Sequence, residues 1–332
     1  MVRDREVAID GALFRTRIRR AVERRRLLGL PSPETSAVRI VNAEGDDLPG
    51  LVVDIFGDVV VVQFGTIGMK RREQAILDAI EEALSPRAIV DRTSAATART
   101  ERFTAGEGVV RGDTAFSTLS FVERGLHYEL PSTLAQKTGF YLDQRPMRGR
   151  IEQLARGRRV LDAYSYVGAF AMAAARGGAT EVVAIDESAT ALEVGAECAR
   201  KNGLIDRIRY ARSDARERMN TAGREGGFDL VLCDPPKFAP TKGARSGALG
   251  AYQKLAQAAC RATKPGGLLL LSSCSAAVGL DALTRALALG AREVNARATV
   301  LERFFQGFDH PVVSAFPEGL YLKSVLALVE SM

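Results

Sequence analysis

Cys274 is the side chain in this sequence best suited to nucleophilic chemistry. It follows a predicted strand at 268–272 within a Ser-Ser-Cys-Ser run. A thiol at the edge of a binding cleft, near helix N-termini and basic groups, has a lowered pKa and acts as a nucleophile. The alternative is a buried, inert thiol, as we expect for Cys198 and Cys260 in helices and Cys233 in an apolar strand.

A second segment with chemical potential is Asp234-Pro235-Pro236-Lys237-Phe238, which follows the predicted strand 229–233. Two prolines fix an extended, rigid turn that holds the Asp234 carboxylate and the next carbonyl toward a pocket. Phe238 can stack on a planar ring. Such a loop is typical of enzymes that alkylate a base, and the alternative is an ordinary proline turn.

Together, the thiol and the carboxylate fit methylation of carbon 5 of cytosine. Carbon 5 is not nucleophilic by itself. Addition of the Cys274 thiolate at carbon 6 moves electron density onto carbon 5, which can then take a methyl group from a sulfonium. Asp234 can hydrogen-bond ring nitrogen 3 and the exocyclic amine, and the target base must leave its stack to reach such a pocket.

Four acids end four successive predicted strands: Asp162, Asp186, Asp214 and Asp234. Asp186 can accept from both hydroxyls of a ribose, Asp214 from an adenine amino group, and Asp162 can oppose a cofactor ammonium. A nicotinamide dinucleotide carries a pyrophosphate that prefers a glycine-rich loop absent from this chain. The pattern therefore favours S-adenosylmethionine. The alternative is that each carboxylate caps the following helix.

The elements that position these residues alternate between strand and helix from about residue 131. This rhythm predicts an open, mostly parallel, doubly wound sheet whose ligands lie beyond the carboxyl ends of its strands. Strands are expected at 160–162, 182–186, 208–211, 229–233 and 268–272, with 300–305 and an antiparallel 321–329 closing the sheet. Helices are expected near 143–155, from 168, and at 188–202, 246–262 and 280–289.

The first part of the chain predicts a helix at 11–28 and then a small α/β unit. Its strands are expected at 37–41, 51–54 and 59–64, followed by a helix at 69–84 and a strand from 89. The segment 92–108 is polar and predicts a mobile connection. A second hairpin is expected around Arg124-Gly125.

Composition sets further bounds. The chain has 332 residues, of which 46% are hydrophobic and 26% charged, which suits a globular protein of about two domains. No apolar run approaches a membrane span and no signal peptide is evident. Four widely spaced cysteines indicate reduced thiols in a cytoplasmic protein, and two histidines argue against a metal site.

The net charge of +6 is unevenly distributed, because seven arginines crowd the first predicted helix. They are Arg15, Arg17, Arg19, Arg20, Arg24, Arg25 and Arg26. This concentration indicates a polyanionic partner such as nucleic acid, and the alternative is a solvated helix face.

In combination, several segments resemble the bacterial large-subunit ribosomal RNA cytosine 5-methyltransferases, the RlmI-like group of S-adenosylmethionine enzymes. The segments are VNAEGDDLPGLVVD at 41–54, QKTGFYLDQR at 136–145, DPPKF at 234–238, SCS at 273–275, DHP at 309–311 and FPEGLYLK at 316–323.

The resemblance implies a Rossmann-like class I methyltransferase domain at 131–332 with a mostly parallel seven-stranded sheet. It implies a small α/β domain at 36–130 that helps to seat RNA, after the arginine-rich segment 1–35. It also implies 23S ribosomal RNA as the partner, and relatives suggest a homodimer.

The resemblance also assigns roles to residues. The implied catalytic residues are Cys274 and Asp234. The implied cofactor contacts are Asp143, Gln144, Arg145, Asp162, Tyr164, Ser165, Gly168, Asp186, Asp214, Asp234 and Pro235. The expected substrate contacts are Pro236, Lys237, Phe238, Arg19 and Arg20.

Two departures from the family pattern stand out. Family members usually begin with a PUA RNA-binding domain, whereas this chain keeps only the arginine-rich helix that follows it, so the basic helix carries more of the expected RNA binding. Ala169 also stands where many relatives have a second glycine, which tightens the loop without abolishing the site.

Three alternatives remain at this level. A guanine nitrogen-7 methyltransferase shares the Asp-Gln-Arg helix and a proline loop but does not need a thiol at position 274. A small-molecule methyltransferase on the same fold would act on a metabolite. A non-catalytic RNA-binding protein would bind RNA and need not bind S-adenosylmethionine.

Overall fold

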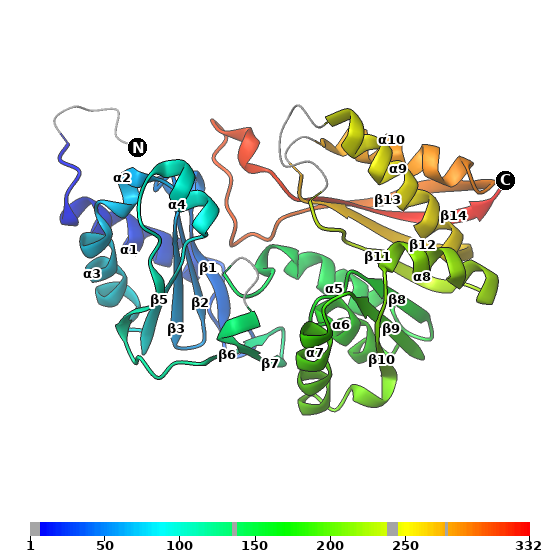
Figure 1. Ribbon diagram of the computed structural model, residues 1–332, viewed down its shortest axis with the longest axis horizontal. Coiled ribbons are helices and arrows are strands. Elements are labelled where there is room, and N and C mark those ends of the chain that lie inside the picture. Colours follow the sequence, from blue (N-terminus) through cyan, green and yellow to red (C-terminus); the bar gives the residue numbers. More distant parts are fainter. Residues whose placement is uncertain (1–6, 135–137, 238–244, 276–277) are drawn as a thin grey trace. The chain divides into compact units, whose positions relative to one another are not determined.

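The computed structural model describes residues 7–134, 138–237, 245–275 and 278–332 (Figure 1). It divides into two compact units, Met1–Asp143 with Gly307–Gly319, and Gln144–Gln306 with Leu320–Met332. The chain therefore crosses between the units three times. Within the described ranges, no helix has the length and apolar character of a membrane span.

The first unit is built on a five-stranded sheet in the order β1-β2-β3-β4-β5. Its strands are β1 Ala37–Asn42, β2 Leu51–Phe56, β3 Val59–Phe64, β4 Ala88–Arg92 and β5 Glu107–Gly112. The pairing is antiparallel except between β3 and β4, which are parallel. Gly57, with φ at 63°, makes the tight turn between β2 and β3, because glycine adopts a positive φ without steric cost.

The helices of this unit are α1 Gly11–Leu27, α2 Ile67–Lys70, α3 Glu73–Leu84 and α4 Ala95–Glu101, with the short η1 Ala43–Asp46 after β1. Asp10 caps α1 by accepting from the backbone N–H of Leu13 at 3.1 Å. Helix α1 packs on α3 and β1 through a core that includes Phe14 and Ile18. A separate hairpin, β6 Thr118–Glu123 and β7 Leu126–Pro131, turns at Arg124-Gly125 as expected.

One expectation for this unit is wrong. The segment 92–108, expected to be only a mobile connection, contains the helix α4 and the start of β5. Ser94 caps α4 by accepting from the N–H of Thr97 at 3.1 Å, and only Ala98 of this helix is buried. A short helix that covers so little core lacks the apolar periodicity that would reveal it.

Arg25 shows that the arginine-rich helix is partly structural. Its side chain is buried, and its guanidinium donates to both carboxylate oxygens of Asp46, at 2.6 and 2.8 Å, and to the carbonyl of Asp309 at 2.8 Å. The Asp309 carboxylate in turn accepts from the Arg39 backbone N–H at 3.2 Å. Two segments quoted from the sequence, 41–54 and 309–311, therefore meet around one buried charge.

The second unit is a seven-stranded sheet in the order β10-β9-β8-β11-β12-β14-β13. The strands are β8 Arg159–Ala163, β9 Glu181–Asp186, β10 Ile208–Arg212, β11 Phe228–Cys233, β12 Thr263–Ser273, β13 Ala296–Phe305 and β14 Lys323–Ser331. The first five of this order are mutually parallel, and β14 is antiparallel to both its neighbours. The predicted doubly wound, mostly parallel sheet is confirmed.

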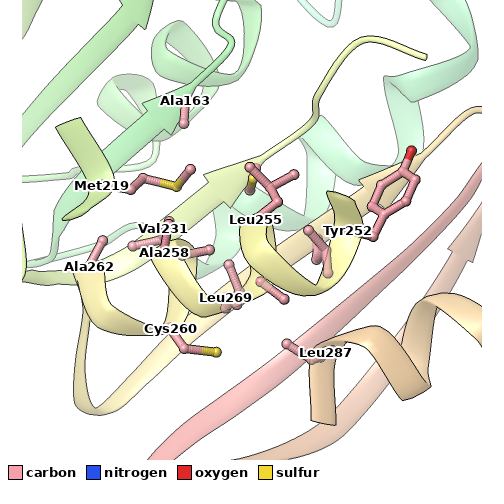
Figure 2. Packing of buried hydrophobic residues seen from close by; sticks show 14 of the residues in the cluster. Ala163, Met219, Val231, Tyr252, Leu255, Ala258, Cys260, Ala262, Leu269 and Leu287 are labelled. Atoms are coloured by element: carbon pink, nitrogen blue, oxygen red, sulfur yellow. The ribbon is translucent and has the colours of Figure 1, made fainter. Parts of the chain in front are cut away.

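Helices α5, α6 and α7 lie on one face of this sheet, and α8, α9 and α10 on the other (Figure 1). They are α5 Arg145–Leu154, α6 Ala169–Arg176, α7 Ala189–Lys201, α8 Ala215–Ala222, α9 Arg245–Ala262 and α10 Leu280–Arg292. Leu255 and Ala258 of α9 pack over Val231 of β11 and Leu269 of β12 (Figure 2). The strand order reverses between β8 and β11, so a ligand crevice is expected beyond the carboxyl ends of these two strands.

Candidate functional site

The loop between β8 and α6 lies at the strand-order reversal and has an unusual backbone. Tyr164, Tyr166 and Gly168 all have a positive φ, at 65°, 53° and 70°. The Ser165 N–H donates to the carbonyl of Ile185 at 2.8 Å, and the Gly168 N–H donates back to the Ser165 carbonyl at 2.8 Å. Non-glycine residues rarely adopt this conformation, and such strain concentrates at ligand sites.

Gly168 is required by space as well as by φ. A Cβ at this position lies 2.8 Å from the ring and hydroxyl of Tyr210, whose hydroxyl donates to the Gly195 carbonyl at 3.0 Å. We expect Gly168→Ala to destabilise the fold by about 2–3 kcal/mol, the φ penalty plus the clash. Gly157 is the matched control, since its φ is 73° and nothing lies within 4 Å of its Cβ.

Urea unfolding measures the free energy of unfolding of the wild type and of both glycine variants. Gly157→Ala is expected to cost only about 1 kcal/mol, the φ penalty alone. Equal losses in the two variants would show that Tyr210 does not constrain the loop.

Asp162 is a buried acid near the carboxyl end of the strand β8. Only 2% of its surface is exposed, and its carboxylate accepts from the Ala171 N–H of α6 at 2.9 Å. Burial, with the nearby charges of Asp234 and Asp186, raises the pKa of Asp162 to about 8, against the opposing effects of the Ala171 N–H and Arg148. A cation placed here would relieve this penalty, as the ammonium of an amino-acid tail does.

Asp186 ties the β8 loop to the end of β9. One of its carboxylate oxygens accepts from the Tyr166 N–H at 2.8 Å and the other from the Ser188 N–H at 2.9 Å. The carboxylate is thus held rigidly at the second strand, the position from which acids hydrogen-bond a ribose in nucleotide folds.

Asp214 caps α8, because its Oδ1 accepts from the Glu217 N–H at 2.6 Å. Its side chain is exposed. A cavity of about 480 Å³ lies along the outer side of α8. It is lined by Asp214, Arg216, Glu217, Asn220, Thr221 and Arg224. The acid that ends β10 therefore serves the helix and also borders an open hollow.

The structure brings together two segments that lie ninety residues apart. The side chain of Gln144, which precedes α5, donates to a carboxylate oxygen of Asp234 after β11. Gln144 and Arg145 are buried, at 6% and 5% exposure. Pro235 is buried, whereas Pro236 and Lys237 are exposed.

The predicted base-stacking residue Phe238 lies outside the described residues. Asp143, the first residue of the Asp-Gln-Arg segment, is buried at the end of the other unit, and its carbonyl accepts from the Gly307 N–H at 2.9 Å.

Cys274 differs from the other three cysteines in exposure. It is half-buried, whereas Cys198, Cys233 and Cys260 are buried. Burial raises the pKa of the Cys260 thiol to about 12 and raises that of Cys233 as well. Tyr252 of α9 interacts electrostatically with Cys274 and with Asp234. Cys274 and Asp234 follow the neighbouring parallel strands β12 and β11, so both lie at the same edge of the sheet.

Arg19 and Arg20 lie on α1 in the first unit and are both exposed. Arg19 pairs with Glu82 of α3 at 3.0 Å, while the side chain of Arg20 makes no hydrogen bond or ion pair with any described residue. The described chain also holds no cluster of acids, histidines and cysteines that could bind a metal.

The residues around the β8 loop fit S-adenosylmethionine. The hydroxyl of Ser165 is buried and has no hydrogen-bond partner among the described residues. A buried polar atom without a partner is costly and points to a ligand atom that supplies the bond. This hydroxyl, the buried carboxylate of Asp162 and the fixed carboxylate of Asp186 are groups of the kind that could bond the amino-acid tail and the ribose of the cofactor.

Sequence reasoning missed Tyr210 and Lys323. Tyr210 packs against the loop glycine, and nothing in the sequence signals that contact. Lys323 is buried and donates to the Ser275 carbonyl at 2.7 Å. It is the last residue of the 316–323 segment that carried the family resemblance, and that position was the available signal.

A doubly wound sheet with a tight loop and acids at the carboxyl ends of its strands defines a class I S-adenosylmethionine-dependent methyltransferase. Residues 47–320 match the family model described as S-adenosylmethionine-dependent methyltransferase. The protein named Ribosomal RNA large subunit methyltransferase I from Erwinia tasmaniensis is 34% identical over 318 residues, which is 95% of this chain and 80% of that relative. Its namesake in Shewanella denitrificans is 33% identical over 328 residues, or 98% of this chain and 82% of the relative.

The chain belongs to the ribosomal RNA large subunit methyltransferase I family of S-adenosylmethionine-dependent methyltransferases. It is therefore an enzyme, and S-adenosylmethionine is its methyl donor. The family resemblance read from the sequence is confirmed.

Solved structures confirm the fold. A methyltransferase from Streptococcus mutans superposes with a TM-score of 0.84 at 21% identity, covering 98% of this chain and 83% of that one. A methyltransferase structure solved in complex with SAH gives a TM-score of 0.85 at 21% identity and the same coverage. The predicted Rossmann-like methyltransferase fold, preceded by a small α/β unit, is thus confirmed.

Proposed function

We propose that this enzyme methylates carbon 5 of a cytosine in 23S ribosomal RNA, with Cys274 as the covalent nucleophile. The family name of the relatives supports ribosomal RNA as the substrate. The observation that carries the cytosine assignment is that Cys274 is half-buried, whereas the other three thiols are buried. Cys274 follows β12, the parallel neighbour of β11, and Asp234 follows β11. Methylation of an unreactive ring carbon needs a nucleophile that first adds to the ring, and a thiol can supply it.

The proposed reaction begins when the Cys274 thiolate forms a bond from Sγ to carbon 6 of the flipped cytosine. The electron pair of the ring double bond moves to carbon 5. S-adenosylmethionine, when bound, supplies the methyl group that carbon 5 takes. A base then removes the carbon 5 proton, the double bond re-forms, and the Sγ–carbon 6 bond breaks to release the thiolate.

Asp234 has the supporting role in this proposal. Gln144 donates to one of its oxygens, which orients the carboxyl group, and Pro235 fixes the backbone that follows. The carboxyl group is then placed to hydrogen-bond ring nitrogen 3 and the exocyclic amine of cytosine. Those bonds favour the ring form in which carbon 6 accepts the thiolate.

Helix α1 contributes the proposed phosphate contacts. Charge reversal at Arg19 and Arg20 is expected to weaken RNA binding about tenfold. It is also expected to make the affinity depend less steeply on salt concentration, because a protein that contacts fewer phosphates releases fewer counterions when it binds. Filter binding across a salt series measures both. Arg209→Glu on β10 is the control, since Arg209 is exposed and lies outside α1. Unchanged affinity and slope in the α1 variant would remove the helix from the RNA interface.

The proposed function is tested with unmodified 23S ribosomal RNA and S-adenosylmethionine. Mass spectrometry of the digested RNA is expected to show 5-methylcytosine at one position. Appearance of 7-methylguanine instead would overturn the cytosine assignment. Methyl transfer to members of a metabolite panel, with none to RNA, would overturn the RNA substrate.

A further inference from the structure

Lys323 occupies a place where a lysine is unexpected. It is the first residue of β14, the strand between β12 and β13, and its backbone pairs with Ser273 on one side and Phe305 on the other. Only 5% of its surface is exposed. Lysines are rarely buried to this extent without a partner that offsets the cost of removing the charge from water.

The side chain of Lys323 reaches across to the strand that carries Cys274. Its Nζ donates to the carbonyl of Ser275 at 2.7 Å in a buried hydrogen bond. The backbone of Lys323 pairs with Ser273, and its side chain bonds the carbonyl of Ser275. Lys323 therefore contacts the residues on both sides of Cys274. Ser273 and Ser275 are themselves fully buried, so this turn is fixed on both sides of the thiol.

No carboxylate compensates this ammonium. In the part of the chain that the structure describes, Lys323 forms no ion pair with an aspartate or glutamate. Burial lowers the pKa of Lys323, and the opposing influence that raises it comes from Cys274. The acidic group electrostatically coupled to the buried amine is thus the thiol.

We propose that Lys323 is a positioning residue for Cys274, holding the turn through the Ser275 carbonyl and serving as the counter-ion of the Cys274 thiolate. This inference rests on the proposed role of Cys274 as nucleophile. An adjacent cation stabilises a thiolate relative to the thiol. The thiol proton leaves to solvent, and a thiolate–ammonium pair remains at the edge of β12.

Other ionisable groups also act on this pair. Tyr252 of α9 is coupled to Cys274 and also to Asp234, which follows β11. Lys237, exposed on the Asp-Pro-Pro loop, is coupled to Lys323 and lowers the pKa of its amine. Lys323 is the buried cation of this set, and solvent screens it least.

The pH dependence of Cys274 alkylation by iodoacetamide, followed by peptide mass spectrometry, tests the proposal. In the wild-type enzyme the thiol is expected to titrate below the ordinary value of about 8.5. Lys323→Met is expected to raise the thiol pKa by about one unit and so to slow alkylation at neutral pH about tenfold. Lys264→Met is the matched control. Lys264 lies at the opposite end of β12 and pairs with Asp229 at 2.9 Å.

Single-turnover methyl transfer separates this role from a merely structural one. Loss of a counter-ion moves the pH–rate profile of Lys323→Met toward alkaline pH, with the rate recovering as the thiol ionises. A disturbed fold lowers the rate at every pH. Calorimetry with S-adenosylhomocysteine reports whether the variant is folded.

A wild-type thiol that titrates at or above about 8.5 would overturn the proposal, and this measurement needs no variant. An unchanged thiol pKa in the folded Lys323→Met variant would also overturn the proposal. Cys274→Ala keeps the two questions apart. If the Cys274→Ala variant still methylates RNA, the covalent mechanism is wrong even if Lys323 does lower the pKa of the Cys274 thiol.

Discussion

Cys274→Ala is expected to lower methyl transfer to ribosomal RNA by at least about a thousandfold, because removing a covalent nucleophile eliminates the path that activates carbon 5. Affinity for S-adenosylhomocysteine, measured by calorimetry, is expected to remain within about twofold, since the residues around the β8 loop are unchanged. Cys274→Ser is expected to behave like the alanine variant, because a serine hydroxyl is rarely ionised near neutral pH.

Cys198→Ala is the control for this experiment. Cys198 is buried on α7, so its replacement is expected to cost some stability and leave turnover intact. Wild-type turnover on cytosine by folded Cys274→Ala would contradict the covalent mechanism. The methyl group would then have to reach carbon 5 by another route.

Asp162→Asn is expected to weaken S-adenosylmethionine binding about a hundredfold, the value of one hydrogen bond between charged groups. The pKa of the buried Asp162 is about 8 in the protein without cofactor. The cofactor ammonium favours the ionised form, so binding at neutral pH is expected to release a proton. Calorimetry in buffers of different ionisation enthalpy measures that proton.

The same pKa makes a prediction for stability. The folded pKa of Asp162, about 8, lies above the about 3.9 of an unfolded chain, so the native state binds the proton more tightly. The contribution of Asp162 to the free energy of unfolding is fully present below about pH 4 and is lost as pH rises through about 8. Thermal unfolding without cofactor is therefore expected to depend less on pH in Asp162→Asn than in the wild type.

Asp229→Asn is the matched control for Asp162→Asn. Asp229 lies near the start of β11, at the opposite end of the sheet, and pairs with Lys264. It is expected to leave cofactor affinity unchanged. Equal cofactor affinity in Asp162→Asn and the wild type, with no proton released on binding, would place the ammonium elsewhere.

The methyltransferase sheet could be predicted because its strands are apolar runs separated by helical segments. The run 182–186 became β9, Glu181–Asp186, and 229–233 became β11, Phe228–Cys233. Burial on both faces makes such strands continuous in hydrophobicity, and alternation with helices determines that they are parallel. The acids could be located for the same reason, since they directly follow each run.

Other features depend on contacts between residues far apart in sequence. The burial of Arg25 depends on Asp46 and on the Asp309 carbonyl, and an arginine in a basic helix gives no sign of this. Helix α8 was missed because only Ala215, Met219 and Ala222 of it are buried. Likewise, the sequence places Lys323 in the expected strand 321–329 and in the 316–323 segment, but only the pairing of β14 with β12 places it next to the turn that contains Cys274.

Trapping with RNA that carries 5-fluorocytosine at the methylated position tests the central claim most directly. Fluorine replaces the carbon 5 proton and cannot be removed as a proton, so the bond between Sγ and carbon 6 does not break after methyl transfer. The covalent mechanism predicts a stable protein–RNA complex whose peptide adduct maps to Cys274. Steady methylation of cytosine, with no adduct formed on the fluorinated RNA, would contradict it.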